Sequence, residues 1–170
     1  SVGVIVALVG ALGGMFATGQ ALRQRQPEKQ RHAQFWVLVM LGGVAVAVAA
    51  MEVALLRNDF SLEYVANNST RSTPLLYKMA TLWGALEGSI LLWGFILVGY
   101  VSAATWSFRR RLDDRLMGFA MFTMFVVCAF FFMLLVGPAH PFGRLAEAPA
   151  DGAGLNPLLR NHPLMAIHPL

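Results

Sequence analysis

The sequence predicts an all-α polytopic membrane protein, and three observations support this fold class. First, 57% of the 170 residues are hydrophobic and 13% are charged, with a mean hydropathy of +0.60. An ordinary soluble domain is only about 45–50% apolar. Second, the chain holds four apolar stretches of the length that a helix needs to cross a hydrocarbon core, about 20 residues. Third, the basic residues gather between these stretches.

The four predicted transmembrane helices cover about residues 2–22, 35–56, 87–106 and 116–137. Between the second and third, residues 57–86 form a polar outer connection that includes a helix. We therefore expect residues 1–137 to form one transmembrane region. The remaining residues, 138–170, are rich in Pro and Gly and form a segment outside the membrane.

The orientation follows from the basic residues of the short connections. The first connection holds Arg23, Arg25, Lys29 and Arg31, and the third holds Arg109, Arg110, Arg111 and Arg115. Both should face the cytoplasm, which puts the N-terminus and the other loops on the outer side of the membrane. Because the arginines cluster at helix ends and form no stripe, the net charge of +4 indicates contact with membrane lipid and no nucleic-acid partner.

The outer connection leads into the third span without an obvious break. From Pro74 to Trp106 the sequence has no further Pro and no strong turn signal, so it predicts one long helix that enters along the outer surface. Gly84 and Gly88 form a G-x-x-x-G pair on that helix. Such a pair lets a second helix approach closely.

Glu87 is a charged residue in front of an apolar run. It lies roughly 33 Å from Arg109 along a helix, close to the outer boundary of the membrane. One interpretation is an interface carboxylate that pairs with Lys78 or an arginine; the other is a functional group that faces an outward site. Trp83 and Trp93 have the same two interpretations, as membrane-interface anchors or as ligand contacts.

The C-terminal segment carries three of the four histidines: His140, His162 and His168. Their spacing matches no zinc pattern, and no cysteine accompanies them. Neutral imidazole is, however, the usual axial ligand of haem iron, and the outer surface of a membrane is a suitable place for such a ligand. Each histidine is therefore either a polar loop residue or a haem ligand.

Two stretches of the chain together resemble the CcmF/NrfE family, the haem lyases of cytochrome c biogenesis. Over residues 58–93 the shared motifs are NDF, YVA and WG..EGS.LLW. Over residues 140–169 they are NPLL, which begins with Asn156 and Pro157, and a terminal HP. The motifs are specific and occur in the family's order, whereas the other spans agree only as hydrophobic helices.

The resemblance implies a multi-pass protein of the bacterial inner membrane that takes haem at its periplasmic face. The haem chaperone CcmE delivers it, CcmH- and CcmI-type proteins present apocytochrome c, and thioether bonds form to the CxxCH cysteines. The family's first periplasmic haem-ligating histidine matches His168, and Trp83, Glu87 and Trp93 are further candidates for haem contact. The resemblance identifies no catalytic residue in this chain.

The chain also departs from the family. Leu86 stands where many relatives have a histidine, and Leu170 follows the terminal HP where the family has a second proline. The family's tryptophan-rich segment, its second periplasmic histidine and the ligands of a permanent second haem lie downstream. We therefore expect a fragment that is not a competent lyase alone. The alternative function is a structural or transport subunit of a larger membrane complex.

Overall fold

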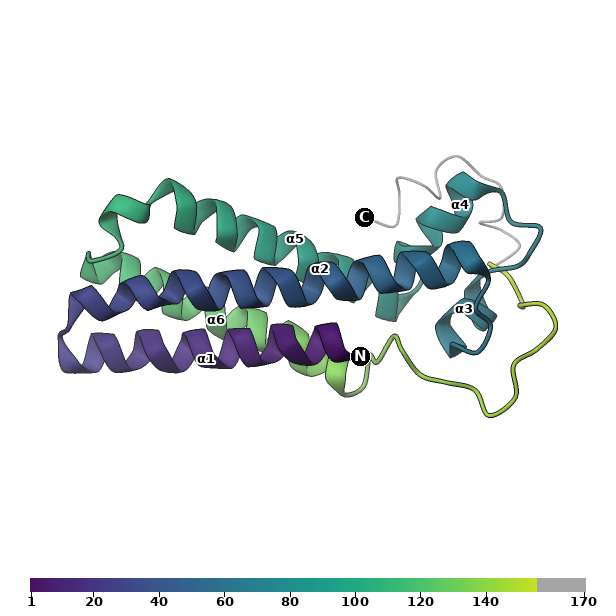
Figure 1. The fold of residues 1–170 in the computed structure, drawn as a ribbon, viewed down its shortest axis with the longest axis horizontal. Helices are drawn as coiled ribbons and strands as arrows, with labels where there is room; N and C mark the ends of the chain where they lie inside the picture. Colours follow the sequence, from purple (N-terminus) through teal and green to yellow (C-terminus); the bar gives the residue numbers. More distant parts are fainter. Residues whose placement is uncertain (156–170) are drawn as a thin grey trace.

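Four long helices dominate the structure, a computed structural model that describes residues 1–155 apart from the side chains of residues 27–29 (Figure 1). They are α1 (Val2–Gln24), α2 (Ala33–Arg57), α5 (Leu86–Ser107) and α6 (Arg115–Val136). Each is long and apolar enough to cross a membrane. Within the described part there is no strand, only an isolated bridge between Leu62 and Arg144. The prediction of an all-α protein with four spans is confirmed.

Short helices and loops form the two ends of the bundle. At one end the 3-10 helices η1 (Pro27–His32) and η3 (Arg109–Arg111) make tight connections. We call residues 23–32 and 108–115 the arginine end. At the other end lie α3 (Glu63–Asn68), α4 (Leu75–Ala80) and the 3-10 helix η2 (Thr81–Trp83), together with an extended segment after α6. We call residues 58–85 and 137–155 the loop end (Figure 1).

Small residues let the long helices pack closely. A Cβ atom on Gly3 would lie 2.6 Å from the backbone oxygen of Gly43, and one on Gly10 would lie 2.8 Å from the backbone nitrogen of Met40. At Gly14, a Cβ atom would collide with the ring of Phe125, which is fully buried. Helices in a membrane associate through close packing of this kind, because apolar lipid gives no hydrophobic drive between them.

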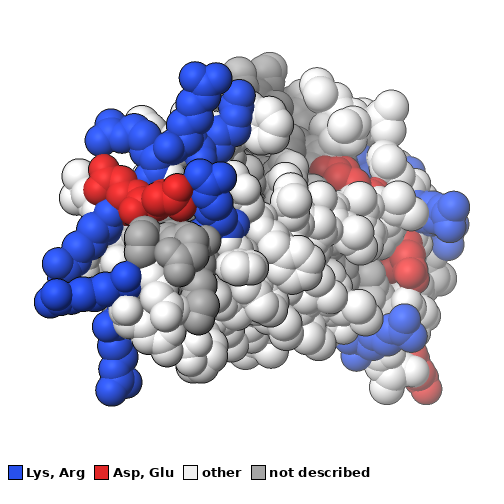
Figure 2. All heavy atoms as spheres, turned by 60° about the vertical axis from the view of Figure 1, so that its left-hand side comes forward, with Lys and Arg blue, Asp and Glu red and all other residues white. Residues whose placement is uncertain are grey.

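Charged side chains lie at the two ends of the bundle and leave an apolar belt between them (Figure 2). The belt includes large hydrophobic side chains that point away from the core, such as Leu38 at 66% and Tyr100 at 73% exposure. Exposed apolar side chains in this number suit a surface that contacts lipid. The apolar belt therefore agrees with the length and apolar content of the four helices in indicating a membrane protein.

The first two helices stop in the same way. Arg25 and Asn58 both have a φ of 55°, in the left-handed region, directly after the last helical residue. The next backbone N–H then reaches back five residues, from Gln26 to Ala21 and from Asp59 to Ala54, at 3.0 Å in both cases. This Schellman arrangement satisfies carbonyl groups that a helix end leaves free.

The predicted continuous helix from Pro74 to Trp106 is wrong. The structure ends α4 at Ala80, makes one 3-10 turn and then places Ala85 in an extended conformation, with φ −140° and ψ 167°. Gly84 therefore lies outside α5, while Gly88 lies in its first turns, and the two glycines do not share a face of one helix. A Cβ atom on Gly88 would lie 2.0 Å from the carbonyl oxygen of Leu82, so this glycine lets the turn fold back onto α5.

Candidate functional site

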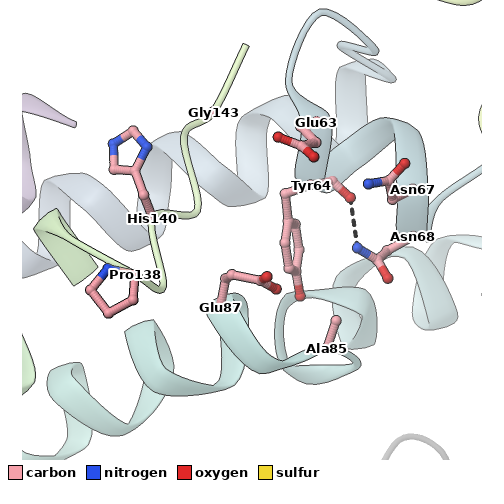
Figure 3. A pocket seen from close by; sticks show the side chains of 9 residues that line it. All are labelled: Glu63, Tyr64, Asn67, Asn68, Ala85, Glu87, Pro138, His140 and Gly143. Carbon is pink, nitrogen blue, oxygen red and sulfur yellow. Dashed lines mark hydrogen bonds between the residues drawn. The ribbon is translucent and has the colours of Figure 1, made fainter. Parts of the chain in front are cut away.

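A cavity of about 540 Å³ opens at the loop end (Figure 3). Three segments that are far apart in sequence line it: Glu63, Tyr64, Asn67 and Asn68 of α3, Ala85 and Glu87 at the start of α5, and Pro138, His140 and Gly143 after α6. The lining is polar, with two carboxylates, two amides, a phenol and an imidazole. We call it the loop-end cavity.

Tyr64 forms the wall between the cavity and the core. Its side chain is almost fully buried, and its hydroxyl donates to the carbonyl oxygens of Thr81, at 2.7 Å, and Leu82, at 3.1 Å. Burial raises the pKa of the phenol, with a smaller contribution in the same direction from the negative charge of Glu87. Tyr64 is therefore a neutral hydrogen-bond donor that ties α3 to η2.

Glu87 lies in the first turn of α5, where a carboxylate interacts favourably with the helix dipole. In Figure 3 its carboxylate points toward Tyr64, in the cavity. Among the described residues Glu87 forms no ion pair. The expected partner Lys78 is buried elsewhere, where its Nζ donates to the side-chain oxygen of Asn58 at 2.7 Å. Pairing of Glu87 with Lys78 is therefore excluded in this arrangement.

The extended segment after α6 is fastened to α3 and to the residues before it. Glu63 donates its backbone N–H to the carbonyl oxygen of Gly143 at 2.9 Å, and Leu145 donates to Ser61 at 3.0 Å. Further along, Ala153 donates to the carbonyl oxygen of Ala66 at 2.8 Å. These bonds close the cavity on one side and fix the path of the chain as far as residue 153.

A clasp between Arg71 and Asp151 reinforces this attachment. Asp151 accepts hydrogen bonds from the backbone N–H groups of Arg71, at 2.9 Å, and Gly152, at 2.8 Å, which hold the pKa of its carboxyl below the ordinary value. The Arg71 guanidinium donates to the carbonyl oxygen of Ala150 at 3.1 Å and lies over the ring of Phe60. The clasp consequently joins three segments of the loop end.

Two polar atoms beneath the cavity lack a hydrogen-bond partner among the described residues. They are Oε2 of Glu52, on α2, and Nε1 of Trp83, in η2. Trp83 packs against the hydrophobic core, whereas Trp93 on α5 is 51% exposed. Neither tryptophan lines the cavity. Of the three predicted contact residues, the structure thus brings only Glu87 to this site.

The remaining predicted site residues, Asn156, Pro157 and His168, lie outside the described residues, so their contribution stays a prediction. Sequence analysis missed Glu63 and Tyr64, which belong to a helix of six residues, too short to show a helical period. The available signal was the YVA motif itself, which begins with Tyr64. His140 was considered as a loop histidine, and the structure places it at the rim of the cavity, with its ring near that of Phe142.

The described lining of the loop-end cavity does not fit haem. Among the residues that the structure describes, this lining includes Glu63 and Glu87 and neither Lys nor Arg, whereas haem carries two anionic propionates that require positive partners. Within the same described residues, His140 is the only imidazole of the lining. The described residues also contain no group of three or more His, Cys, Asp or Glu side chains that could hold a metal ion. The lining suits hydrogen-bond donors or cationic groups.

Comparison with known proteins gives a consistent set of relatives. The chain is 39% identical over 127 residues to the cytochrome c-type biogenesis protein CcmF of Pseudomonas aeruginosa, covering 74% of this chain and 19% of that protein. It is 39% identical over 132 residues to the cytochrome c-type biogenesis protein ccl1 of Rhodobacter capsulatus, with 78% and 20% covered. No family model matches the chain.

A solved structure is similar over almost the whole chain. It is titled cytochrome c heme lyase CcmF, and the comparison gives a TM-score of 0.80 and 33% identity, covering 98% of this chain and 26% of that one. The cytochrome c-type biogenesis protein CcmF of Pseudomonas fluorescens aligns over a similar length, at 35% identity over 167 residues. This chain spans about a fifth to a quarter of the length of the relatives it matches.

Proposed function

We propose that this chain, which belongs to the CcmF/NrfE family of cytochrome c-type biogenesis proteins, is one part of a haem lyase of cytochrome c maturation. The whole protein would receive haem from a chaperone and attach it to the CxxCH cysteines of apocytochrome c. The observation that carries the proposal is the fold similarity over 98% of the chain, at 33% identity, to a protein titled as a haem lyase.

The arrangement of charge supports a specific topology for this part. The arginine end would face the cytoplasm and the loop end the periplasm of a bacterial inner membrane, in keeping with the bias of basic residues toward the cytoplasm. The haem chaperone CcmE, CcmH- and CcmI-type proteins and apocytochrome c would then meet the protein at the loop end. Haem and apocytochrome would both be handled on that side.

Within this function we assign His168 as an axial ligand of the transferred haem. Support comes from its match to the family's HP motif and from the segment before it, which is fixed to α3 at Ala153. Bound haem supplies the reactive vinyl groups, and the protein supplies position and orientation. The loop-end cavity would serve this role indirectly, because its walls hold the outer segment in place.

The test is the visible spectrum and haem content of the full-length protein, purified together with its haem chaperone. We expect His168→Ala to remove the chaperone-delivered haem. Any permanent haem held by the rest of the polypeptide should remain, because its ligands lie elsewhere. His162→Ala is the matched control, since it removes an imidazole six residues away in the same segment and should leave the spectrum unchanged.

Two outcomes would contradict the proposal at different levels. If His162→Ala removes the haem and His168→Ala does not, the ligand assignment is wrong while the lyase function stands. If the wild-type protein binds no haem with or without the chaperone, the lyase function itself is overturned, and a structural or transport role in a membrane complex takes its place.

A further inference from the structure

A second pocket, of about 280 Å³, lies at the arginine end of the bundle. Its lining residues are Ala21, Leu22, Arg25, Gln30, Asp113 and Arg115. They come from the last turns of α1, the connection that follows it, and the start of α6. We call it the arginine-end pocket. It lies among the basic side chains that gather at this end in Figure 2.

Asp113, the one described carboxylate of this pocket, is paired with Arg31. Arg31 donates to both carboxylate oxygens of Asp113, from Nη2 at 2.8 Å and from Nε at 3.1 and 3.3 Å. This fork-shaped contact lowers the pKa of Asp113 and keeps it ionised and paired. Among the side chains that the structure describes, no carboxylate forms an ion pair with Arg25 or Arg115. Arg25 and Arg115 thus bring two guanidinium groups to the pocket with no ion-pair partner among the described carboxylates.

The frame of the pocket is well fixed. Gln30 is 5% exposed, and its amide nitrogen donates to the carbonyl oxygens of Leu112, at 2.7 Å, and Asp114, at 3.2 Å. The same terminal amide atom of Gln30 fits against Gly118, where a Cβ atom would lie 2.6 Å from it. The first connection is thereby held against the start of α6, and the pocket keeps its shape without depending on the exposed arginines.

The position of the pocket, at the ends of membrane-spanning helices, indicates which kind of anion it can bind. It lies where two membrane-spanning helices end and begin, with the apolar side chains of Ala21 and Leu22 on one side and guanidinium groups on the other. The Arg115 guanidinium lies 5.7 Å from the centre of the Phe119 ring, on the lipid-facing belt. A lipid headgroup presents this combination, a phosphate above an acyl chain, whereas a free phosphate ion has no apolar part.

We propose that the arginine-end pocket binds the phosphate of an anionic phospholipid, with Arg25 and Arg115 as its direct contacts. Guanidinium groups bind phosphate oxygens in pairs, and basic residues near a membrane surface attract anionic lipid. The lipid would lie between the ends of α1 and α6 and close the apolar side of the pocket. The proposal is independent of the haem lyase function.

The test is native mass spectrometry of the full-length protein in detergent, with phosphatidylglycerol added. We expect Arg25→Ala combined with Arg115→Ala to weaken lipid binding about thirty-fold, because each substitution removes a charge-assisted hydrogen-bonding contact with the phosphate. The control combines Arg109→Ala and Arg110→Ala, which removes the same charge from the same end but from outside the pocket lining. It should change binding less than three-fold.

Three results would overturn the proposal. Equal weakening by the two double variants would mean a diffuse attraction with no site. Equal retention of zwitterionic phosphatidylethanolamine by the wild type would exclude selection for anionic lipid. Displacement of the lipid by excess inorganic phosphate at constant ionic strength would show that the pocket binds the free ion. Arg25→Lys combined with Arg115→Lys keeps both charges and controls for misfolding; it should weaken binding less than the alanine pair, because the ammonium groups keep the attraction but lack the paired donors.

Discussion

The two ends of the bundle are connected by different physical means. At the arginine end, short 3-10 turns join neighbouring helices, and the contacts between side chains are mostly exposed, such as the Arg31–Asp113 pair. At the loop end, long connections are held by a buried tyrosine, a buried lysine and backbone hydrogen bonds between distant segments. The arginine end thus has short turns with exposed ion pairs, and the loop end has long connections with buried hydrogen bonds between distant segments.

The charge content of the two ends follows the same division. The residues from Arg23 to Arg31 and from Arg109 to Arg115 include eight basic and three acidic residues. The loop end, residues 58–85 and 137–155, includes three basic and four acidic residues. We expect the stability of the loop end to respond to changes in side-chain volume. The ion pairs of the arginine end should respond to salt, because they are exposed and therefore screened, and each contributes little to stability.

The largest expected effect is at Gly88. Its Cβ position lies 2.0 Å from the carbonyl oxygen of Leu82 and 2.2 Å from the hydroxyl of Tyr64, so Gly88→Leu forces η2 and α3 away from α5. We expect a loss of about 3 kcal/mol in the free energy of unfolding, at the upper end for overpacking. Gly99→Leu on the same helix is the control, because nothing lies within 4 Å of its Cβ position. Thermal unfolding in detergent measures both, and equal losses would refute the division between the two ends.

An intermediate effect is expected at Tyr64. Tyr64→Phe keeps the ring and removes the hydroxyl that bonds to Thr81 and Leu82, which leaves buried carbonyl oxygens without that donor. The expected loss is about 2 kcal/mol, within the range for an unsatisfied buried group. Tyr100→Phe, at a side chain that is 73% exposed, should change the unfolding midpoint little. A neutral result for Tyr64→Phe would mean that the hydroxyl is not what ties α3 to η2.

The smallest expected effect is the pH dependence of the clasp at Asp151. The pKa of Asp151 is lowered in the folded protein, so the clasp contributes stability above the unfolded pKa near 3.9 and loses it as the pH falls through the lower folded value. The protection factors for hydrogen exchange of residues 138–155, which are taken relative to the intrinsic exchange rate at each pH, should therefore fall between about pH 5 and pH 3. Asp151→Asn should show the faster exchange already at pH 7. Asp113→Asn is the counterpart at the arginine end and should leave exchange in residues 138–155 unchanged.

The sequence predicted the part of the fold that depends on composition. Length and apolar content can be read from each stretch by itself, so the sequence was sufficient to predict the four spans and their arginine-rich connections. The break before α5 did not, because no Pro marks it. The turn at Gly84 and Ala85 depends on the contact of Leu82 with Tyr64, eighteen residues before Leu82 in the chain, and such tertiary contacts override local propensity.

The candidate site was predictable only in part for the same reason. Glu87 was singled out because a charge before an apolar run is conspicuous, whereas Glu63 and His140 are ordinary polar residues until the fold brings them to one cavity. The arginine-end pocket also needed the structure. Arg25 and Arg115 differ from the other arginines because they line one pocket, and the described carboxylate of that pocket, Asp113, is already paired with Arg31.

The contact between α1 and α2 has a consequence for how membrane sequences change. Where Gly3 meets Gly43, the two backbones touch, and any larger side chain separates them. Replacing either glycine with leucine would make the segment more hydrophobic and favour its insertion into the bilayer. The same change would prevent the inserted helices from assembling. Entry into the membrane and folding within it thus set opposite demands at these positions, and glycine satisfies the second at the expense of the first.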